Sequence, residues 1–422
     1  MRWLSCMLLT GVWWANAIWG LPFLTVLCPS ERYYAAKQRA HQKLTERAWQ
    51  MMALLSRWLP ERALVFVADS SFAVFVLLDQ VSRRKNVSLI TRLRMDAQLY
   101  DFAPERKAGQ QGRPRIKGAR RLSPAQRLKD RQTKWEKLEV ENWYGGGKRQ
   151  VEVYSETCLW GTTGKPYVPI RWVLVRDVRG EFEPCAFLST ELTHEPLQML
   201  TWFVRRWRME VTFEEARAHL GIETQRQWND LAIARSTPLL FGLFSLVTLM
   251  ANAVIKGETK VVRTTAWYEK EQPTFSDALA LVRRCLWSSC HFQMSHFEDD
   301  IVKIPRSLFE RLTDAVCYAA RLDKVELIGP IPGTASNKAI SGNAWAACNS
   351  NFSAAFCVVI VCSSTVKSWV IAVLIAWETT CGRAFSRPVA RKTRRSRTIM
   401  PCRRRRALIF SLGRFCCWHR SS

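Results

Sequence analysis

The sequence predicts an α/β fold with a β-rich insertion, followed by helices and a basic tail. Three observations predict it. Residues 1–95 alternate apolar strand-like runs with helical segments, an order typical of a sheet flanked by helices. Residues 96–195 change to strands separated by glycine-rich turns, which indicates an inserted antiparallel unit. From residue 196 to about residue 320 the pattern is helical.

The first region, residues 1–95, is expected to form the first part of the core. Its elements in order are two strands up to Leu27, a helix near Leu44–Leu59, the strand ALVFVAD, a helix from Phe72 to Arg84 and the strand VSLITRLR. The opening MRWLSCMLLTGVWWANAIWG also resembles a secretory signal, because Arg2 and an apolar run precede Ala15-Asn16-Ala17. Its tryptophans and the following apolar run suit a pair of core strands equally well.

The insertion, residues 96–195, opens with the basic loop GQQGRPRIKGARR and continues through a charged helix. The strands RQVEVYSETCLW, VPIRWVLVRD and PCAFLS follow it. Asp177 ends the second of these strands, and the sequence Asp-Val-Arg-Gly there is typical of a hairpin turn. Three tryptophans of the insertion, Trp143, Trp160 and Trp172, are candidates for stacking on an extruded base, but a core role is expected for each.

The third region, residues 196–323, begins with an uninterrupted helical run from Leu197 to Leu220, and Gly221 stands where a C-terminal glycine belongs. At 3.6 residues per turn one face of this helix carries Phe203, Arg206, Trp207, Glu210, Phe213, Glu214 and Arg217. Geometry allows two interpretations of Glu210 among these side chains. It is a member of i to i+4 ion pairs on a surface helix, or a metal ligand set among phosphate-binding arginines.

Two apolar runs raise the question of a membrane. Residues 239–255 are short and carry Ser, Thr and Asn, so we expect a buried helix. Residues 356–377 are long enough to span a bilayer if Lys367 is tolerated at mid-depth. We expect no membrane partner.

The charge favours a polyanionic partner. Lys and Arg exceed Asp and Glu by 27, and residues 324–422 supply 14 of that excess, which leaves +13 for residues 1–323. A body this basic favours nucleic acid first and an anionic membrane surface second. Residues 324–422 lack clear periodicity and end in arginine clusters, so we expect a disordered Arg-rich tail.

The 14 cysteines are scattered and form no CxxC pair. Cys285, Cys290, His291 and His296 form a loose cluster, but its spacing matches none of the common zinc patterns. We therefore expect reduced thiols in a cytoplasm.

Asp69 ends the strand ALVFVAD and precedes small residues and a helix. In an open α/β sheet the carboxyl ends of strands are where ligand chemistry collects. The alternative is that Asp69 or Ser70 caps the helix that follows.

A carboxylate at a strand end and another on a late helix have a chemical use in a basic chain. Two hard Mg²⁺ ions need oxygen ligands held close together to activate a hydroxyl and stabilise a leaving oxygen in phosphodiester displacement.

The spacing on the helix resembles a known signature. The chain is similar to bacterial insertion-sequence transposases of the DDE class, the group with Tyr-x2-Arg-x3-Glu-x6-Lys, a group typified by insertion sequence four. The matching positions are Phe203 for the Tyr, Arg206, Glu210, and Arg217 for the Lys. The stretches LVFVADSSFA, GRPRIKGARR and EVTFEEARAHLGIETQRQWNDLAIARSTPLL extend the resemblance from about residue 1 to residue 320.

The resemblance implies an RNase H-like core that acts on DNA. Asp69 would take the second and Glu210 the third carboxylate position, both as catalytic groups and as ligands of two Mg²⁺ (or Mn²⁺) ions. The DNA contacts would come from Phe203, Arg206, Arg217, Arg113, Arg115 and Lys117. The implied partners are insertion-sequence ends and target DNA, with a homodimer on the DNA and a cytoplasmic, nucleoid-associated location.

The first Asp of the resemblance has no counterpart, because no Asp precedes Asp69. The chain is therefore expected to be N-terminally truncated, to begin inside the catalytic domain, and to be inactive in strand cleavage. Two alternatives stay open. One is a non-catalytic DNA-binding fragment or inhibitor of a full-length transposase. The other is a membrane or secreted protein, which rests on the first twenty residues and on residues 356–377.

Overall fold

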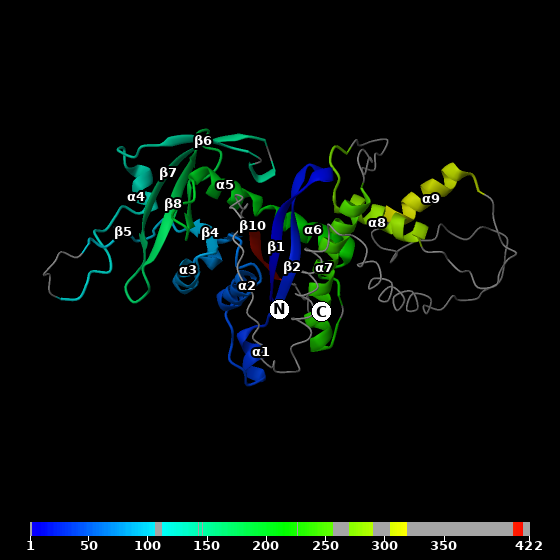
Figure 1. Cartoon of the computed structure of the whole chain (residues 1–422), viewed down its shortest axis with the longest axis horizontal. Coiled ribbons are helices and arrows are strands. Elements are labelled where there is room, and N and C mark those ends of the chain that lie inside the picture. The colour runs from blue at the N-terminus through cyan, green and yellow to red at the C-terminus, as the bar shows by residue number, and fades with distance from the viewer. Residues whose placement is uncertain are drawn as a thin grey trace, which may run out of the picture. The chain divides into compact units, whose positions relative to one another are not determined.

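The protein is described here as a computed structural model (Figure 1). The structure describes residues 2–105, 112–141, 143–145, 147–225, 227–255, 270–289, 304–318 and 408–416. Residues 1–318 and 401–422 belong to one compact unit. The second unit, residues 319–400, lies outside the described residues, as do the apolar run 356–377 and the cluster residues Cys290, His291 and His296.

Within the described part, ten strands form one mixed sheet in the order β2-β1-β10-β3-β4-β9-β8-β7-β5, with β6 paired to β7. The strands are β1 (Arg2–Val12), β2 (Ala17–Cys28), β3 (Leu64–Ala68), β4 (Val87–Leu93), β5 (Leu99–Tyr100), β6 (Glu136–Val140), β7 (Arg149–Trp160), β8 (Val168–Asp177), β9 (Cys185–Ser189) and β10 (Leu408–Cys416). Strands β3, β4 and β10 run parallel, and the other pairs are antiparallel. The expected α/β class is confirmed at this level.

Helices cover both faces of the sheet (Figure 1). They are α1 (Glu31–Ala36), α2 (Leu44–Trp58), α3 (Phe75–Ser82), α4 (Pro124–Lys129), α5 (Pro196–Arg205), α6 (Arg208–Leu220), α7 (Asp230–Val254), α8 (Phe275–Ser289) and α9 (Arg306–Tyr318). Helices α2 and α3 pack in one buried cluster with one face of β1, β3 and β4. The opposite face packs against α5 over β3, β4 and β9, and against α6, α7 and α8 over β1 and β2.

Alternation along the strands produces these two faces. In β3 the side chains of Leu64 and Phe66 enter the cluster under α2 and α3, while Val65 and Val67 enter the cluster under α5. All five β3 residues are buried, as expected for a strand covered on both sides. Asp69 continues this alternation with extended backbone angles, so it points to the α5 side.

β10 comes from the far C-terminal part of the chain and lies in the middle of the sheet. It pairs antiparallel with β1 from Arg2↔Cys416 to Leu8↔Phe410, and parallel with β3 from Leu64↔Leu408 to Ala68↔Leu412. The predicted disordered tail over residues 324–422 is therefore wrong for Leu408–Cys416. The apolar run LIFSL has high β propensity, and it satisfies the backbone groups of β1 and β3 that would otherwise face a gap.

The opening twenty residues form β1 and β2, joined by a short turn, which agrees with the prediction of core strands. Predicted strands 149–160 and 168–177 have the observed bounds of β7 and β8. The insertion is antiparallel, as predicted, and is continuous with the core sheet because β9 pairs with β4. The helix predicted from Phe72 begins instead as a 3-10 turn at Ser70–Phe72, followed by α3.

Helix α7 is long and apolar enough, by length and composition, to cross a membrane. It packs against β2, and its Ser245 hydroxyl donates a hydrogen bond of 2.5 Å to the carbonyl of Pro22. Phe241, Phe244 and Val247 are buried in the cluster that α7 shares with α6 and α8. In this structure α7 is a core helix, which agrees with the buried helix predicted for residues 239–255.

Candidate functional site

Asp69 lies at the carboxyl end of β3, where the sequence places it. Its carboxylate Oδ1 accepts a hydrogen bond of 2.9 Å from the backbone N–H of Ser71, and it also contacts the Ser71 hydroxyl. Its carbonyl accepts a 2.7 Å hydrogen bond from Thr91 on the neighbouring β4. Asp69 thus caps the 3-10 turn, as the alternative interpretation predicts. The cap orients the carboxylate and leaves it half-buried at the strand end.

Glu210 lies in the first turn of α6, directly after a tight junction with α5. The predicted single helix over Leu197–Leu220 is wrong at this point. The N–H groups of Arg206 and Trp207 donate to the carbonyls three residues earlier, at 3.1 Å each, in a 3-10 turn. Neither Pro nor Gly causes this break. The tighter turn changes the phase of the helix, so that Trp207 points outward and is 41% exposed.

Helix α6 is fixed to the sheet through Thr212. Its hydroxyl donates hydrogen bonds to the carbonyl of Gly20 in β2, at 2.8 Å, and to that of Arg208, at 3.0 Å. A Cβ on Gly20 would lie 3.2 Å from this hydroxyl, so the glycine permits the close approach. Thr212 is not among the residues of the helix face predicted around Glu210, and the structure buries it at 3% exposure.

Arg206 and Glu210 form an ion pair with 3.3 Å between nitrogen and oxygen. The Glu210 side chain is 41% exposed, so the pair contributes about 1 kcal/mol at most. Arg206 is more buried, its guanidinium lies 5.5 Å from the ring centre of Phe203, and its Nε atom lacks a hydrogen-bond partner among the described residues. The i to i+4 ion pair that the surface-helix interpretation predicts is therefore present. It is too weak to prevent Glu210 from binding a ligand.

Asp69 and Glu210 lie on the same face of the sheet, on either side of β10. Ser411 of β10 pairs with Val67, two residues before Asp69. The Ser411 hydroxyl also lies 3.6 Å from the sulfur of Met209, the residue before Glu210. The structure therefore brings the β3 end and the α6 start together around one residue of β10.

β10 supplies no carboxylate to this place. Its sequence, LIFSLGRFC, contains no Asp or Glu. Since Leu412 pairs with Ala68 in parallel register, Gly413 is the residue beside Asp69. Among the residues that the structure describes, no group of three or more His, Cys, Asp or Glu side chains is arranged to hold a metal ion. The described side chains at this face therefore do not make a complete metal site.

Two signature positions differ in exposure. Phe203 is 2% exposed, and its ring packs 4.5 Å from that of Phe187 in the core. The ring fills the space between α5 and the sheet, and the DNA contact of Phe203 stays a prediction. Arg217 is 48% exposed and its Nε lies 3.4 Å from the Glu223 carboxylate. It remains at the surface of α6, as a phosphate contact requires.

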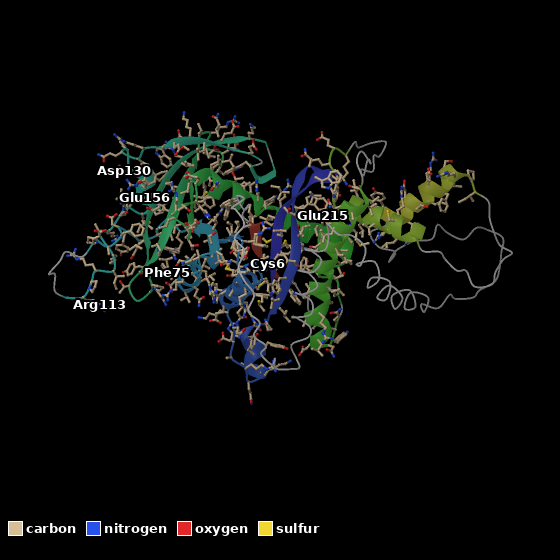
Figure 2. The ribbon with its side chains drawn as sticks, viewed as in Figure 1. Cys6, Phe75, Arg113, Asp130, Glu156 and Glu215 are labelled. Atoms are coloured by element: carbon tan, nitrogen blue, oxygen red, sulfur yellow. The ribbon has the colours of Figure 1, made fainter. Side chains whose placement is uncertain are left out.

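The basic loop of the insertion lies at the opposite edge of the sheet from α6. The loop pairs with β5 through the bridge between Tyr100 and Arg120, and β5 and β2 are the two ends of the strand order. Figure 2 labels Arg113 in this loop and Glu215 on α6. The structure thus does not join Arg113, Arg115 and Lys117 with Arg206 and Arg217 in one patch.

Within that loop Arg113 and Arg115 are exposed, whereas Lys117 is engaged with two aromatic rings. Its ammonium lies 3.7 Å from the ring centre of Tyr100 and 4.8 Å from that of Tyr167. Hydrogen bonding to Tyr167 raises the pKa of Lys117. Arg113 and Arg115 are therefore the members of this set that can reach a phosphate without breaking an existing contact.

The core role expected for each tryptophan of the insertion is confirmed for Trp160 and Trp172, whereas Trp143 is half-buried. Trp160 and Trp172 are 4% and 0% exposed and belong to the core. Trp143 stacks on Phe182, with ring centres 5.2 Å apart, and meets Tyr144 edge-on. The ring centres of Tyr144 and Trp207 lie 6.1 Å apart, so this part of the insertion contacts the α5–α6 junction.

Sequence reasoning missed the contribution of β10, Thr91 and Thr212 to the site. The alternating apolar run at 408–412 is the one signal for β10, and the flanking arginine clusters obscure it. Thr91 and Thr212 act through long-range hydrogen bonds, for which a sequence carries no local pattern. Cys6, Cys28, Cys158, Cys185 and Cys317 are not joined in disulfides.

One comparison bears on this arrangement. Residues 6–150 match the model of a family described as DDE superfamily endonuclease. The matched segment covers β1 to β6 and includes Asp69, and it ends before Glu210. No curated protein shows a significant match to the chain.

Proposed function

We propose that this protein is a DNA-binding chain of the DDE transposase type, which recognises insertion-sequence ends and does not cleave them unaided. The observation that carries the proposal is the position of Asp69. It ends a central buried strand inside the segment that matches DDE superfamily endonucleases. In open α/β sheets ligands bind at the carboxyl ends of the strands, which is where Asp69 lies.

The second support is the neighbourhood of Glu210. Phe203 lies on α5, Arg206 lies at the α5–α6 junction, and Glu210 and Arg217 lie on α6. Arg217 is exposed in the last turn of the helix that carries Glu210 in its first turn, and residues 1–323 carry a net +13. Arginines attract the phosphate backbone that bare carboxylates would repel. Under this proposal the fold is RNase H-like, and the protein works on DNA as a homodimer in the cytoplasm, close to the nucleoid.

The proposed lack of cleavage rests on β10. In metal-assisted phosphodiester displacement, carboxylates hold the ions that activate the attacking oxygen and stabilise the leaving one. Asp69 and Glu210 are the two candidates on this face, and Mg²⁺ or Mn²⁺ would be the ion. The residue of β10 beside Asp69 is Gly413, and β10 contains no Asp or Glu that could supply a third carboxylate ligand. With two of three carboxylates, cleavage should fall severely.

Strand cleavage and DNA binding test the proposal separately. The full chain is incubated with duplexes carrying its candidate terminal repeats, in Mg²⁺ or Mn²⁺, and nicks are mapped on denaturing gels. The expected result is salt-sensitive binding without nicking, with log Kd rising linearly with log salt concentration. Nicking by the unaided chain, abolished by Glu210→Gln, would show that the site is complete. Absence of salt-sensitive binding would remove the DNA function altogether.

A second role follows from the same geometry. A chain that binds ends without cleaving them would inhibit a competent transposase by occupying its sites. β10 supports this role, because it stabilises the sheet without completing the carboxylate set. Adding the chain to a cleavage reaction of an intact relative should lower its rate in proportion to occupied ends, and excess DNA should restore the rate.

A further inference from the structure

Trp228 is almost entirely exposed. It lies between α6 and α7 with 97% of its surface in solvent, more than any other large apolar residue that the structure describes. A tryptophan normally buries most of its surface or meets a partner through its ring. We therefore expect this exposed indole to bind a ligand.

The backbone around Trp228 is held in place by side-chain hydrogen bonds. Gln227 accepts a 2.6 Å hydrogen bond from the Ser236 hydroxyl, and Gln225 accepts a 3.1 Å hydrogen bond from the Thr237 hydroxyl. Both donors lie on α7, and Thr237 is 2% exposed. Gln227, the residue before the exposed indole, is therefore tied to α7 through its side chain.

The start of α7 fixes the other side of this segment. Asn229 caps the helix by accepting a 2.8 Å hydrogen bond from the N–H of Leu231. Asp230 accepts a 3.0 Å hydrogen bond from the Tyr33 hydroxyl of α1. These hydrogen bonds order the chain on the α7 side of Trp228, so less of the chain has to be ordered when the ring binds a ligand.

An exposed cation precedes Trp228 in the chain. Arg217 lies in the last turn of α6 and is 48% exposed, and α6 ends at Leu220, before the segment that carries Trp228.

We propose that Trp228 stacks on an unstacked nucleobase of the DNA that this protein binds. The inference rests on the proposed DNA-binding function and deepens it. Within an intact duplex both faces of each base are covered by neighbours, so the indole can reach only a base at an end, in a flap or in a single-stranded stretch. Aromatic side chains bind such bases with little regard to sequence.

The test compares Trp228→Ala and Trp228→Phe with the unmodified full chain. Trp13→Ala serves as a matched control, because Trp13 is also exposed, at 57%, but lies on the turn between β1 and β2. Kd is measured for a blunt duplex and for the same duplex with a short single-stranded flap. A series of flap substrates carries one 2-aminopurine at successive positions, and its fluorescence reports which base is stacked.

We expect Trp228→Ala to weaken binding to flap DNA about tenfold and to leave blunt-duplex binding unchanged. Trp228→Phe should retain most of the affinity, and Trp13→Ala all of it. Quenching of 2-aminopurine should peak at one position and disappear in Trp228→Ala. If the unmodified chain and Trp228→Ala bind flap DNA with the same Kd, the stacking role of Trp228 is overturned. Binding of the blunt duplex would in that case still support the proposed DNA-binding function. Loss of all DNA binding in the unmodified chain overturns both.

Discussion

The rings of Phe66 in β3 and Phe410 in β10 stack with their centres 5.3 Å apart and their planes 25° from parallel. Phe410 also packs 5.6 Å from Phe23 of β2, and it is 3% exposed. These contacts join the C-terminal strand to the strand that carries Asp69 at its end. The integrity of the candidate site therefore depends on a segment more than 300 residues away in the sequence.

Phe410→Ala should destabilise the protein strongly. Truncating a buried Phe removes its apolar contacts and leaves a cavity, at a cost of about 3–5 kcal/mol. That is a large part of the stability of an ordinary domain. Urea unfolding followed by circular dichroism measures the change. Phe309→Ala is the control, because Phe309 is 58% exposed on α9, and we expect almost no change there. Equal midpoints for the two variants would mean that β10 does not support the sheet.

Gly413→Asp should add the missing carboxylate beside Asp69. Strand alternation places position 413 on the face of Ser411, Val67 and Asp69, opposite the Phe410 face. We expect this variant to gain stability in Mn²⁺ through preferential binding of the ion to the folded state, and to nick DNA at a low rate.

The matched control for this variant is Gly413→Asn, which has the same shape and no charge. It should show neither the stabilisation by Mn²⁺ nor nicking. If Gly413→Asp folds like the unmodified chain and melts at the same temperature with and without Mn²⁺, position 413 does not face the two carboxylates.

Thr212→Val tests the attachment of α6 to β2. Valine keeps the shape and removes the donor, so the buried carbonyl of Gly20 loses its hydrogen bond, at a cost of about 1–3 kcal/mol. The control is Thr313→Val on α9, because the Thr313 hydroxyl donates to the carbonyl of Phe309 one turn earlier and crosses to no other element. We expect a clear loss of stability for the first variant and little for the second. The reverse order would remove Thr212 as the anchor of the helix that carries Glu210.

Local patterns predicted the strands of the insertion well. Glycine turns separate the two long strands β7 and β8, so their ends were readable from the sequence. The break between α5 and α6 was not, because it contains no Pro or Gly, and it leaves Phe203 buried and Trp207 partly exposed. Helical periodicity alone put these two residues on one face.

The carboxylates were predictable and their surroundings were not. Asp69 at the end of an apolar strand and Glu210 at signature spacing are local features of the sequence. The third wall of the site, β10, comes from a segment whose composition indicates disorder, and only pairing on both sides makes it a strand. Sheet order, which separates Arg113 from Arg217, is a long-range property that local patterns do not encode.

His194, just before α5, should make stability fall at acid pH. It shares a 2.9 Å hydrogen bond between its Nδ1 and the hydroxyl of buried Ser189, and its ring meets Trp202 edge-on. Burial lowers the pKa of His194 below 6.5, although the charge of Glu191 acts in the opposite direction. The unfolded state therefore binds the proton more readily. The contribution of His194 is complete above the unfolded pKa, about 6.5, and is lost as the pH falls through the window down to the folded pKa.

Urea unfolding at a series of pH values between 7.5 and 5 tests this, with His194→Gln as the comparison. Glutamine keeps a hydrogen-bonding group near Ser189 and does not titrate, so the free energy of unfolding of the variant should depend less steeply on pH below about 6.5. Above that pH the difference between the two proteins should be constant, because neither side chain is charged. A pH slope unchanged by the substitution would show that another group controls acid stability, and that the start of α5 holds its place without a neutral imidazole.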